Sequence, residues 1–245
     1  MNIQTSIIKQ DELIAGERKN MLILYQHYYD NVKPAIFYED LKEKDYVVVI
    51  KDESGDITGF STIQLLNLIA AGRDRLFLFS GDTIIREQTR KSNSLAGAFI
   101  IFMYALIRRY PHTPLYWFLI TKGYRTYRFL QLYFREYYPV FDRPFTQYYR
   151  EVLDAVAIHK FGYDYDPQTN IIRRTKGMDR LKTSFAEVPE GRLKDPHIRF
   201  FLEKNPFYYK GDELGCITDI RIDNFTSVVE RMKMHAKVIF NPGIL

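Results

Sequence analysis

Residues 89–97, TRKSNSLAG, combine positive charge with small polar side chains just before an apolar run. Such a loop, when it turns into a helix, presents unpaired backbone N–H groups and the positive end of the helix dipole, which favours a phosphate or pyrophosphate. The groups that would contribute are Arg90, Lys91, Ser92, Asn93 and Ser94. The same residues also suit an ordinary helix start, because Ser92 or Ser94 could cap the first turn. On these residues alone, both interpretations stay open.

The surrounding residues predict a strand, a helix and a second strand. Residues 75–85, RLFLFSGDTII, should form a strand buried on both faces, because the apolar residues do not alternate with polar ones. A helix should follow and end near Arg109. Its apolar face would hold Leu95, Phe99, Phe102, Met103 and Leu106. Residues 115–121, LYWFLIT, predict the second strand. We therefore expect a right-handed parallel crossover within a mixed sheet.

Two helices and a hairpin are predicted before this unit. Apolar residues at helical spacing predict a helix from Asp11 to about Asp30, and a short helix should follow Pro34. Residues 46–51, YVVVIK, and 57–66, ITGFSTIQLL, flank the turn sequence DESGD and predict a β-hairpin.

The region after the second strand predicts an amphipathic helix over about 124–139, YRTYRFLQLYFREYYP. Its apolar face would carry Tyr127, Leu130, Phe134 and Tyr137. Its outer, basic face would carry Arg125, Arg128, Gln131 and Arg135.

The second half of the sequence has weaker patterns. They predict helices over 147–159 and 195–204, strands over 170–175 and 213–220, and a last helix through Met234 that Asp223 would cap. No linker, repeat or low-complexity tract separates the two halves. We therefore expect a single domain over 1–245, with a core of about 1–145 and a C-terminal part, 146–245, that completes the fold.

Composition predicts a globular protein, because 46% of residues are hydrophobic and 27% are charged. The longest apolar run, 95–107, is shorter than the roughly 20 residues of a membrane-spanning helix. The N-terminal residues show no signal-peptide pattern, and the single cysteine cannot form an internal disulfide, so we expect a cytoplasmic location. That cysteine, Cys216, lies in the apolar run ELGCITDI and should be a buried, inert thiol.

Charge and aromatic content suggest a binding surface. The net charge is +5, and basic residues cluster within 108–136 and 173–182, which would suit phosphates, an acidic protein partner or simply a solvated face. Aromatic residues make up 16% of the chain, enough for an apolar groove with hydroxyl groups along it, although core packing could also use them. The histidines lack metal-ligand spacing, so no structural metal is expected.

The order of these predicted elements resembles that of the GCN5-related N-acetyltransferase (GNAT) superfamily. Several segments look similar to a bacterial branch of GNAT-like proteins, among them YYDNVKPAIFYEDLKEKDYVVVIKDESGDITGFSTIQ, FSGDTII, PLYWFLITKGYRTYRFL and KDPHIRFFLEKNPFYYKGDEL. The resemblance implies an α/β (α+β type) fold with a mixed, mostly antiparallel central sheet flanked by helices and an extended C-terminal half. It also implies direct transfer of an acyl group from a coenzyme A thioester to an amine.

The family holds the donor pyrophosphate in a loop of pattern R/Q-x-x-G-x-G/A, which falls here on residues 90–95 or 91–96. The donor-binding residues that the resemblance implies are Ile85, Arg90, Lys91, Ser92, Asn93, Ser94, Leu95 and Ala96. No glycine lies between Gly81 and Gly97, so the pattern departs from that of the family. A donor whose pyrophosphate is held elsewhere, or the arm of an acyl carrier protein, is therefore a second interpretation. Arg125, Arg128 and Arg135 would meet such a carrier or the phosphates of coenzyme A.

The expected chemistry needs a base for the amine and a proton donor for the leaving thiolate. Asp82 and Glu87, on or just after the strand 75–85, are the candidate bases, although either could serve in a salt bridge instead. The resemblance implies a tyrosine as thiolate proton donor, and Tyr124 is preferred because Tyr127 falls on the apolar face. His27 is a reserve base.

We therefore predict an N-acyltransferase that uses an acyl-coenzyme A or acyl carrier protein thioester and no metal. The donor could be a fatty acyl group, and the acceptor an amino acid or a ribosomally made peptide, because some GNAT-like enzymes use them. A GNAT-shaped module that binds an acyl thioester or a partner without turnover is the alternative. A nucleic-acid-binding role is a third hypothesis, but the sequence has no recognisable helix-turn-helix or RNA-binding signature.

Overall fold

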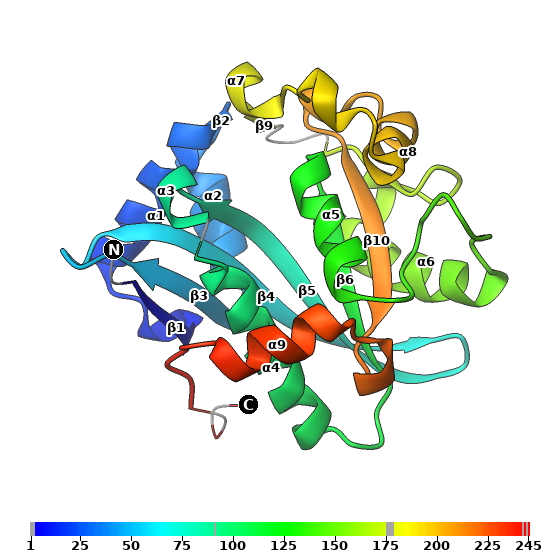
Figure 1. Ribbon diagram of the computed structural model, residues 1–245, viewed down its shortest axis with the longest axis horizontal. Helices are drawn as coiled ribbons and strands as arrows, with labels where there is room; N and C mark the ends of the chain where they lie inside the picture. Colours follow the sequence, from blue (N-terminus) through cyan, green and yellow to red (C-terminus); the bar gives the residue numbers. More distant parts are fainter. Residues whose placement is uncertain (1–2, 91, 175–178, 242, 244) are drawn as a thin grey trace.

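A mixed sheet forms the centre of the molecule. The computed structural model describes residues 3–90, 92–174, 179–241, 243 and 245. In this part of the chain, eight strands pair in the order β1-β3-β4-β5-β6-β10-β8-β7 (Figure 1). In that order, the strands are β1 (Gln4–Lys9), β3 (Tyr46–Lys51), β4 (Ile57–Ala70), β5 (Arg73–Ile85), β6 (Leu115–Thr121), β10 (Glu213–Asp219), β8 (Ile171–Ile172) and β7 (Tyr165–Asp166). Only β5 and β6 pair in parallel among these strands, so the sheet is mostly antiparallel, as expected.

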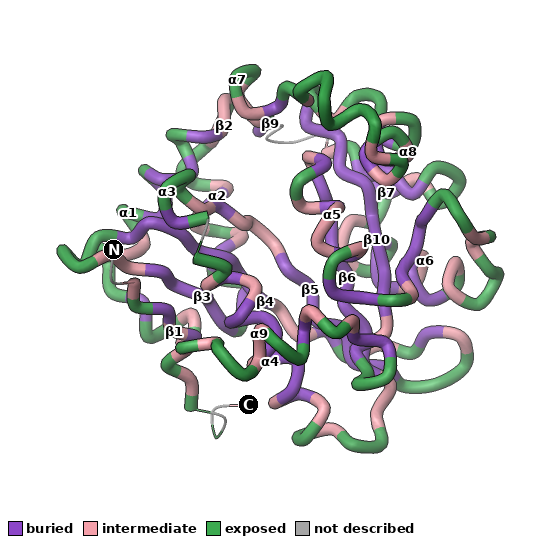
Figure 2. Tube along the Cα trace, viewed as in Figure 1, coloured by how far each residue is buried: buried purple, intermediate pink, exposed green. Residues whose placement is uncertain are grey.

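Helices cover both faces of this sheet. The helices are α1 (Ala15–Tyr28), α2 (Pro34–Lys42), α3 (Glu87–Arg90), α4 (Ser94–Arg109), α5 (Tyr124–Tyr133), α6 (Gln147–Phe161), α7 (Thr183–Ala186), α8 (Pro196–Lys204) and α9 (Ser227–His235). Side chains of α4, α5, α8 and α9 pack on one face, and those of α1, α2 and α6 on the other. The central strands are therefore buried on both sides, and Figure 2 shows long buried stretches along them. A small separate ladder pairs β2 (Tyr29–Asp30) with β9 (Arg180–Leu181).

The predicted crossover is confirmed. Strand β5 leads through α3 and α4 into β6, which pairs with β5 in parallel. All five residues predicted for the apolar face of α4 are buried: Leu95, Phe99, Phe102, Met103 and Leu106. Their burial fixes α4 across the sheet, because packing there removes the apolar face of the helix from water.

The first predicted helix begins later than expected. Residues 10–12 form a 3-10 turn, and Leu13 then adopts an extended backbone with its side chain buried. Helix α1 therefore starts at Ala15 instead of Asp11, and Ile14 is exposed. The short helix after Pro34 and the hairpin of β3 and β4 are confirmed, although β4 runs on to Ala70.

The helix predicted over about 124–139 ends early, at Tyr133. Phe134 takes an extended backbone and forms a bridge with Phe225, and Tyr138 forms another with Ile217. Tertiary pairing with the C-terminal half thus replaces the last helical turns. Phe134 and Tyr137 are still buried, but outside the helix.

The C-terminal half was predicted less accurately. The helices that became α6 and α8 and the strand β10 lie where they were expected. The strand over 170–175 reduces to Ile171–Ile172, and Thr175 lies outside the described residues. The last helix starts at Ser227 after Thr226, whereas Asp223 belongs to a 3-10 turn and pairs with Arg221. Strand β1 was not predicted.

The crossover helix gives a stability prediction. Leu106 of α4 is fully buried, so Leu106→Ala should lower the free energy of unfolding by about 2–5 kcal/mol. The neighbouring Arg108 is exposed, so Arg108→Ala should change it by less than about 0.5 kcal/mol. Urea unfolding followed by circular dichroism measures both. Equal effects of the two substitutions would contradict the packing of α4 on the sheet.

Candidate functional site

The two parallel strands separate at their carboxyl ends. Strands β5 and β6 pair only over residues 76–80 and 115–119. Beyond Ser80, β5 continues to Ile85 with β4 as its partner, while β6 ends at Thr121 (Figure 1). In open sheets, ligands bind in crevices outside the carboxyl ends of parallel strands. This opening is therefore a candidate position for a binding site.

A β-bulge in β5 lies at the start of this opening. Ser61 pairs with Thr83, but Ile63 pairs with Ser80, so β5 contains one extra residue at Gly81 and Asp82. A side chain at position 81 would not fit, because a Cβ atom there would lie 2.6 Å from Thr62 Oγ1. Bulges bend a strand and redirect a side chain. Here Asp82 lines two cavities that lie in and beside the opening.

The larger cavity near the opening has a volume of about 500 Å³, within the range of ligand pockets. We call it the arginine-lined cavity, because Arg90, Arg125, Arg128 and Arg192 contribute to its wall. The rest of the wall is mainly apolar and aromatic, from the end of β5, from α5 and from residues 181–189. It can therefore accept a ligand with both an anionic and an apolar part.

A second, smaller space, the inner cavity, continues from the arginine-lined cavity. Its volume is about 50 Å³, and it shares Tyr29, Thr83 and Gly123 with the larger cavity. Asp82, Lys122 and Glu213 supply its charged groups. A third space of about 20 Å³, the side cavity, lies beyond Asp82 toward α2. Asp82 thus stands where the inner and side cavities meet.

The charged groups around Asp82 form three ion pairs. Lys44 Nζ lies 2.7 Å from Asp40 Oδ1, and Lys122 Nζ lies 2.7 Å from Asp179 Oδ2. The third pair joins Arg174 Nε and Glu213 Oε2 at 3.3 Å. The Tyr25 hydroxyl also donates a hydrogen bond to Asp179. Burial alone would raise the pKa of Asp179, but Lys122, the Tyr25 hydroxyl and Arg174 together outweigh burial, and the pKa is lowered.

Asp82 is different, because among the described residues it has neither an ion-pair partner nor a hydrogen-bond donor. Its side chain is half-buried. Burial raises its pKa to about 6, and the nearby carboxylates of Asp40 and Asp179 add to this effect. A carboxyl group with this pKa and a free oxygen in a cavity is suited to accept a proton near neutral pH.

Tyr124 opens helix α5 and lines the arginine-lined cavity, with 5% of its surface exposed. Tyr127 is fully buried, and its hydroxyl donates a hydrogen bond to Pro139 O at 2.8 Å. The preference for Tyr124 over Tyr127 as a residue that can meet a ligand therefore agrees with their positions.

The residues predicted for donor binding do not share one cavity. Ile85 and Arg90 line the arginine-lined cavity, and Arg90 Nη2 lies 3.5 Å from Ile85 O. Ser92, Asn93 and Ser94 line a separate cavity of about 560 Å³ beside α9, and Leu95 and Ala96 line a small apolar cavity between α4 and α5. Lys91 lies outside the described residues.

The turn before α4 is held by a serine, but the residue at the N-cap position makes no side-chain hydrogen bond to the helix. The helix begins at Ser94, after Asn93 in a left-handed conformation. Ser92 Oγ donates to Thr89 O and accepts from the amide of Ser94 at 3.3 Å, so a serine does hold the turn. Asn93 makes no side-chain cap.

The other predicted site residues lie apart from Asp82. Glu87 is exposed at the start of α3, and it is not among the residues that line the described cavities. His27 is exposed on α1, with its ring against Tyr28 and Phe185.

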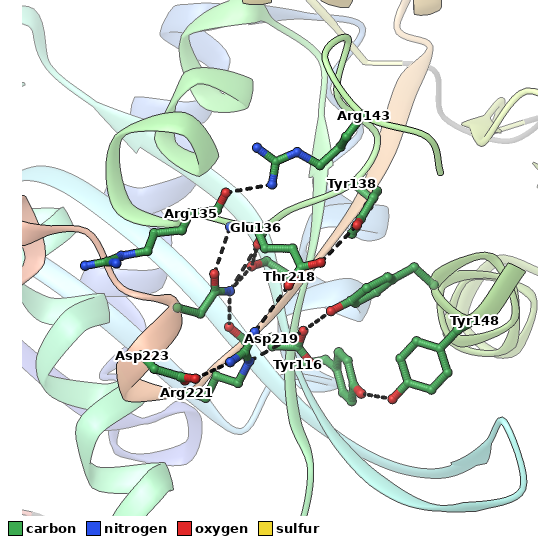
Figure 3. Close-up of polar contacts among 12 residues, drawn as sticks. Tyr116, Arg135, Glu136, Tyr138, Arg143, Tyr148, Thr218, Asp219, Arg221 and Asp223 are labelled. Carbon is green, nitrogen blue, oxygen red and sulfur yellow. Dashed lines mark hydrogen bonds and ion pairs between the residues drawn. The ribbon is translucent and has the colours of Figure 1, made fainter. Parts of the chain in front are cut away.

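The predicted basic stripe is broken. Arg125 and Arg128 lie on α5 at the arginine-lined cavity, but Arg135 follows the helix, and its Nε donates to Phe225 O at 3.0 Å. In Figure 3, Arg143 reaches the backbone oxygen of Arg135. The network around Arg135 includes Glu136, whose carboxylate lies 3.2 Å from Arg221. Its polar groups are mutually bonded, so this network ties the segment after α5 to β10 and is not a second site.

Comparison with known proteins gives matches among solved structures. The sequence matches no protein-family model and no curated protein. Similar solved structures exist. The solved structures that the chain matches include N-acetyltransferases of the GNAT family. A probable N-acyltransferase from Enterococcus faecalis is 12% identical with a TM-score of 0.42, and the match covers 55% of this chain and 33% of that one.

Two further structures illustrate the similarity. A GNAT-family N-acetyltransferase from Escherichia coli in complex with CoA is 16% identical with a TM-score of 0.35, over 50% of this chain and 64% of that one. Glucosamine-6-phosphate N-acetyltransferase from Arabidopsis thaliana is 13% identical with a TM-score of 0.38, over 58% of this chain and 99% of that one. This chain spans about a third of the length of the Enterococcus protein.

Several site residues were not identified from the sequence. Lys122 and Asp179 fall within the two basic clusters of the sequence, and neither has a local pattern that indicates a site. Glu213 had no local signal, because its role depends on the pairing of β10 with β8 and β6. Cys216 is buried as predicted, and burial raises the pKa of its thiol.

Two features are absent from the described part of the chain. No group of three or more His, Cys, Asp or Glu side chains there could hold a metal ion. No helix there has the length and apolar character to cross a membrane.

The raised pKa of Asp82 predicts a pH-dependent stability. Between pH 4 and 6 the folded protein should keep a proton on Asp82 that the unfolded chain has lost, so this group lowers the free energy of unfolding as pH rises through that range. The difference in unfolding free energy between wild type and Asp82→Asn should therefore fall from pH 4 to 6 and then level off. Asp74, exposed on the same strand, provides the control Asp74→Asn. A difference that is flat or rises over this range would contradict the assignment.

Proposed function

We propose that this protein is an N-acyltransferase that moves an acyl group from a pantetheine thioester directly to an amine. The observation that carries the proposal is Asp82, a half-buried carboxyl without a partner among the described residues, at the inner end of a cavity lined by arginines and apolar side chains. Such a carboxyl can serve as a base, and such a cavity can accept a donor that carries phosphate and acyl groups.

The donor would occupy the arginine-lined cavity. Arg90, Arg125 and Arg192 are exposed at its wall and would meet the phosphates of the donor, whereas Arg128 already pairs with Asp195 at 3.1 Å. Beyond Ser80, the edge of β5 that faces β6 has no strand partner among the described residues. Its backbone groups could bond the amide groups of a pantetheine arm, as an added strand would.

The reaction would then need only groups that line these cavities. The amine nitrogen attacks the thioester carbon, and Asp82 takes the proton that the amine loses. The carbon–sulfur bond breaks, and the Tyr124 phenol gives a proton to the leaving thiolate. No covalent intermediate with the protein is required, because amine and thioester are held together.

The finer identity of the substrates is part of the proposal. The apolar wall formed by Ile84, Phe129, Leu132 and Phe185 supports a donor with a fatty acyl chain, because each buried CH2 contributes about 0.8 kcal/mol. The exposed arginines would suit either coenzyme A or an acyl carrier protein. For an acceptor, the narrow inner cavity suits the amine of an amino acid or of a peptide.

The organisation of the chain is proposed in the same way. Residues 146–245 would complete the domain whose core is about 1–145, since Asp179, Glu213 and Arg174 come from the C-terminal part and surround Asp82. A non-catalytic thioester-binding module is the alternative, and it predicts donor binding without release of a free thiol by any amine.

The base and the acid give the first kinetic prediction. Asp82→Asn should lower kcat about 10²–10⁴-fold, and Tyr124→Phe should lower kcat with little change in the KM of the donor. For the wild type, kcat/KM for the amine, expressed per concentration of neutral amine at each pH, should rise with pH through about 6 and then level, because Asp82 must be ionised. Thiol release from acetyl- and octanoyl-coenzyme A in the presence of n-hexylamine measures these values. Full activity of Asp82→Asn would exclude it as the base.

The arginines give a second kinetic prediction. The double substitution Arg90→Ala and Arg125→Ala should raise the KM of the donor about tenfold and leave kcat nearly unchanged, because it removes phosphate binding that is shared by ground and transition states. Arg108→Ala is the matched control, since Arg108 is exposed on α4 and lines none of the described cavities. An unchanged donor KM would place the phosphates elsewhere, for instance beside Ser92 and Ser94.

A further inference from the structure

Thr83, next to Asp82 on β5, has a hydroxyl group whose proton is already used inside the protein. Its Oγ1 donates a hydrogen bond to Gly81 O at 3.2 Å and lies 2.6 Å from Ser61 Oγ. Ser61 is fully buried, and among the described residues Thr83 is the hydrogen-bond partner of its hydroxyl. If Thr83 donated to Ser61, the proton of Ser61 would be buried without a described acceptor, which is costly. The bonds therefore run from Ser61 to Thr83 and from Thr83 to Gly81.

This direction of bonding decides which group Thr83 can recognise. A hydroxyl has one proton and two lone pairs. In Thr83 the proton goes to Gly81 O and one lone pair accepts from Ser61, so the second lone pair remains. Thr83 is half-buried and lines both the inner and the arginine-lined cavity. It can therefore accept a hydrogen bond from an N–H group of a ligand, but it cannot donate to a carbonyl without giving up its bond to Gly81.

An attacking primary amine has two N–H bonds in addition to the lone pair that forms the new bond. Asp82 would take the proton of one N–H, and the other still needs an acceptor, because an N–H group left unpaired in a closed cavity is costly. Thr83 and Asp82 are consecutive residues that both line the inner cavity. That cavity has a volume of about 50 Å³ and holds only a few water-sized groups, so an amine in it lies close to both.

We infer that Thr83 positions the amine substrate by accepting a hydrogen bond from the N–H that Asp82 does not take. The inference rests on the proposed function, because the amine is the acceptor of that reaction. It also implies a selectivity. A secondary amine has a single N–H, which Asp82 uses, so Thr83 would be left without a partner. Thr83 would thus favour primary over secondary amines.

Kinetics with n-hexylamine and N-methylhexylamine, two amines of similar basicity, tests this contact, with acetyl-coenzyme A as the donor. Thr83→Val keeps the shape of the side chain but removes its hydroxyl, so kcat/KM should fall about tenfold for hexylamine and less than about twofold for N-methylhexylamine. Thr83→Ser should restore most of kcat/KM for hexylamine. A rise in the KM of the donor instead, with that of the amine unchanged, would assign the N–H to the pantetheine arm and overturn the inference.

Variants at Ser61 separate this contact from a purely structural role of the two hydroxyls. Ser61→Ala and Thr83→Val remove the same hydrogen bond, but Ser61→Ala leaves the Thr83 hydroxyl in the cavity, so kcat/KM for hexylamine should fall less than about threefold. The double variant leaves neither hydroxyl buried without a partner, and it should be as impaired as Thr83→Val. Equal losses in the two single variants, or recovery in the double variant, would overturn the inference.

Equilibrium binding tests the contact independently of catalysis. Isothermal titration of the full chain with n-hexylammonium chloride, without thioester, should show binding about tenfold weaker for Thr83→Val than for the wild type, and less than about threefold weaker for Ser61→Ala. No binding to the wild type, or equal binding to the wild type and Thr83→Val, would overturn the inference. The expected pattern of binding without thiol release by the wild type would instead overturn the proposed function and leave the contact of Thr83 in place.

Discussion

The structure depends on the separation of β5 from β6 at their carboxyl ends, where both strands still belong to the sheet. Each strand keeps its outer partner after they separate: β5 remains paired with β4 to its last residue, and β6 remains paired with β10 to Thr121. Only the inner edges lose their ladder. A backbone group left dry and unpaired would cost about 1–3 kcal/mol, so the opening is stable only as a space that water or a ligand can enter. The crevice is thus a consequence of the sheet and needs no loop to form it.

The buried ion pairs connect sequence-distant parts of the chain around this crevice. Asp40 and Lys44 lie on and just after α2, Lys122 follows β6, and Asp179, Arg174 and Glu213 come from the last third of the chain. Buried pairs contribute little net stability, but the loss of one partner is costly, because it leaves a charge alone in a poorly hydrated place. The pairs therefore favour one arrangement of the two halves, and in that arrangement no described residue pairs with Asp82.

The hairpin of β3 and β4 and the crossover could be predicted from the sequence because both follow from local patterns. The apolar face of α4 and the runs that became β5 and β6 are long and unambiguous. The end of α5 could not be predicted, because its cause lies far along the sequence. Phe134 and Tyr138 leave the helical pattern and form β-bridges with Phe225 and Ile217. The same reason explains the site. Asp82 and Tyr124 lie beside recognisable strand ends, whereas Asp179 and Glu213 reach the cavity through tertiary pairing alone. The predicted phosphate loop is the converse case, because its described residues are adjacent in sequence but line different cavities.

The bulge at Gly81 bears on how this site could have arisen in evolution. Before the bulge, Leu78 faces the α4 side and Phe79 the α6 side, and after it Ile85 and Ile84 face these same two sides. Because successive side chains of a strand point to opposite faces, a strand without Gly81 would keep each of these apolar residues on its present face. The extra residue is therefore neutral for the hydrophobic core, and only Asp82 would move, into the crowded position beside Thr62 and Lys44. A one-residue insertion could thus have created the free carboxyl without any compensating change in the core, so that the site and the fold could be acquired in separate steps.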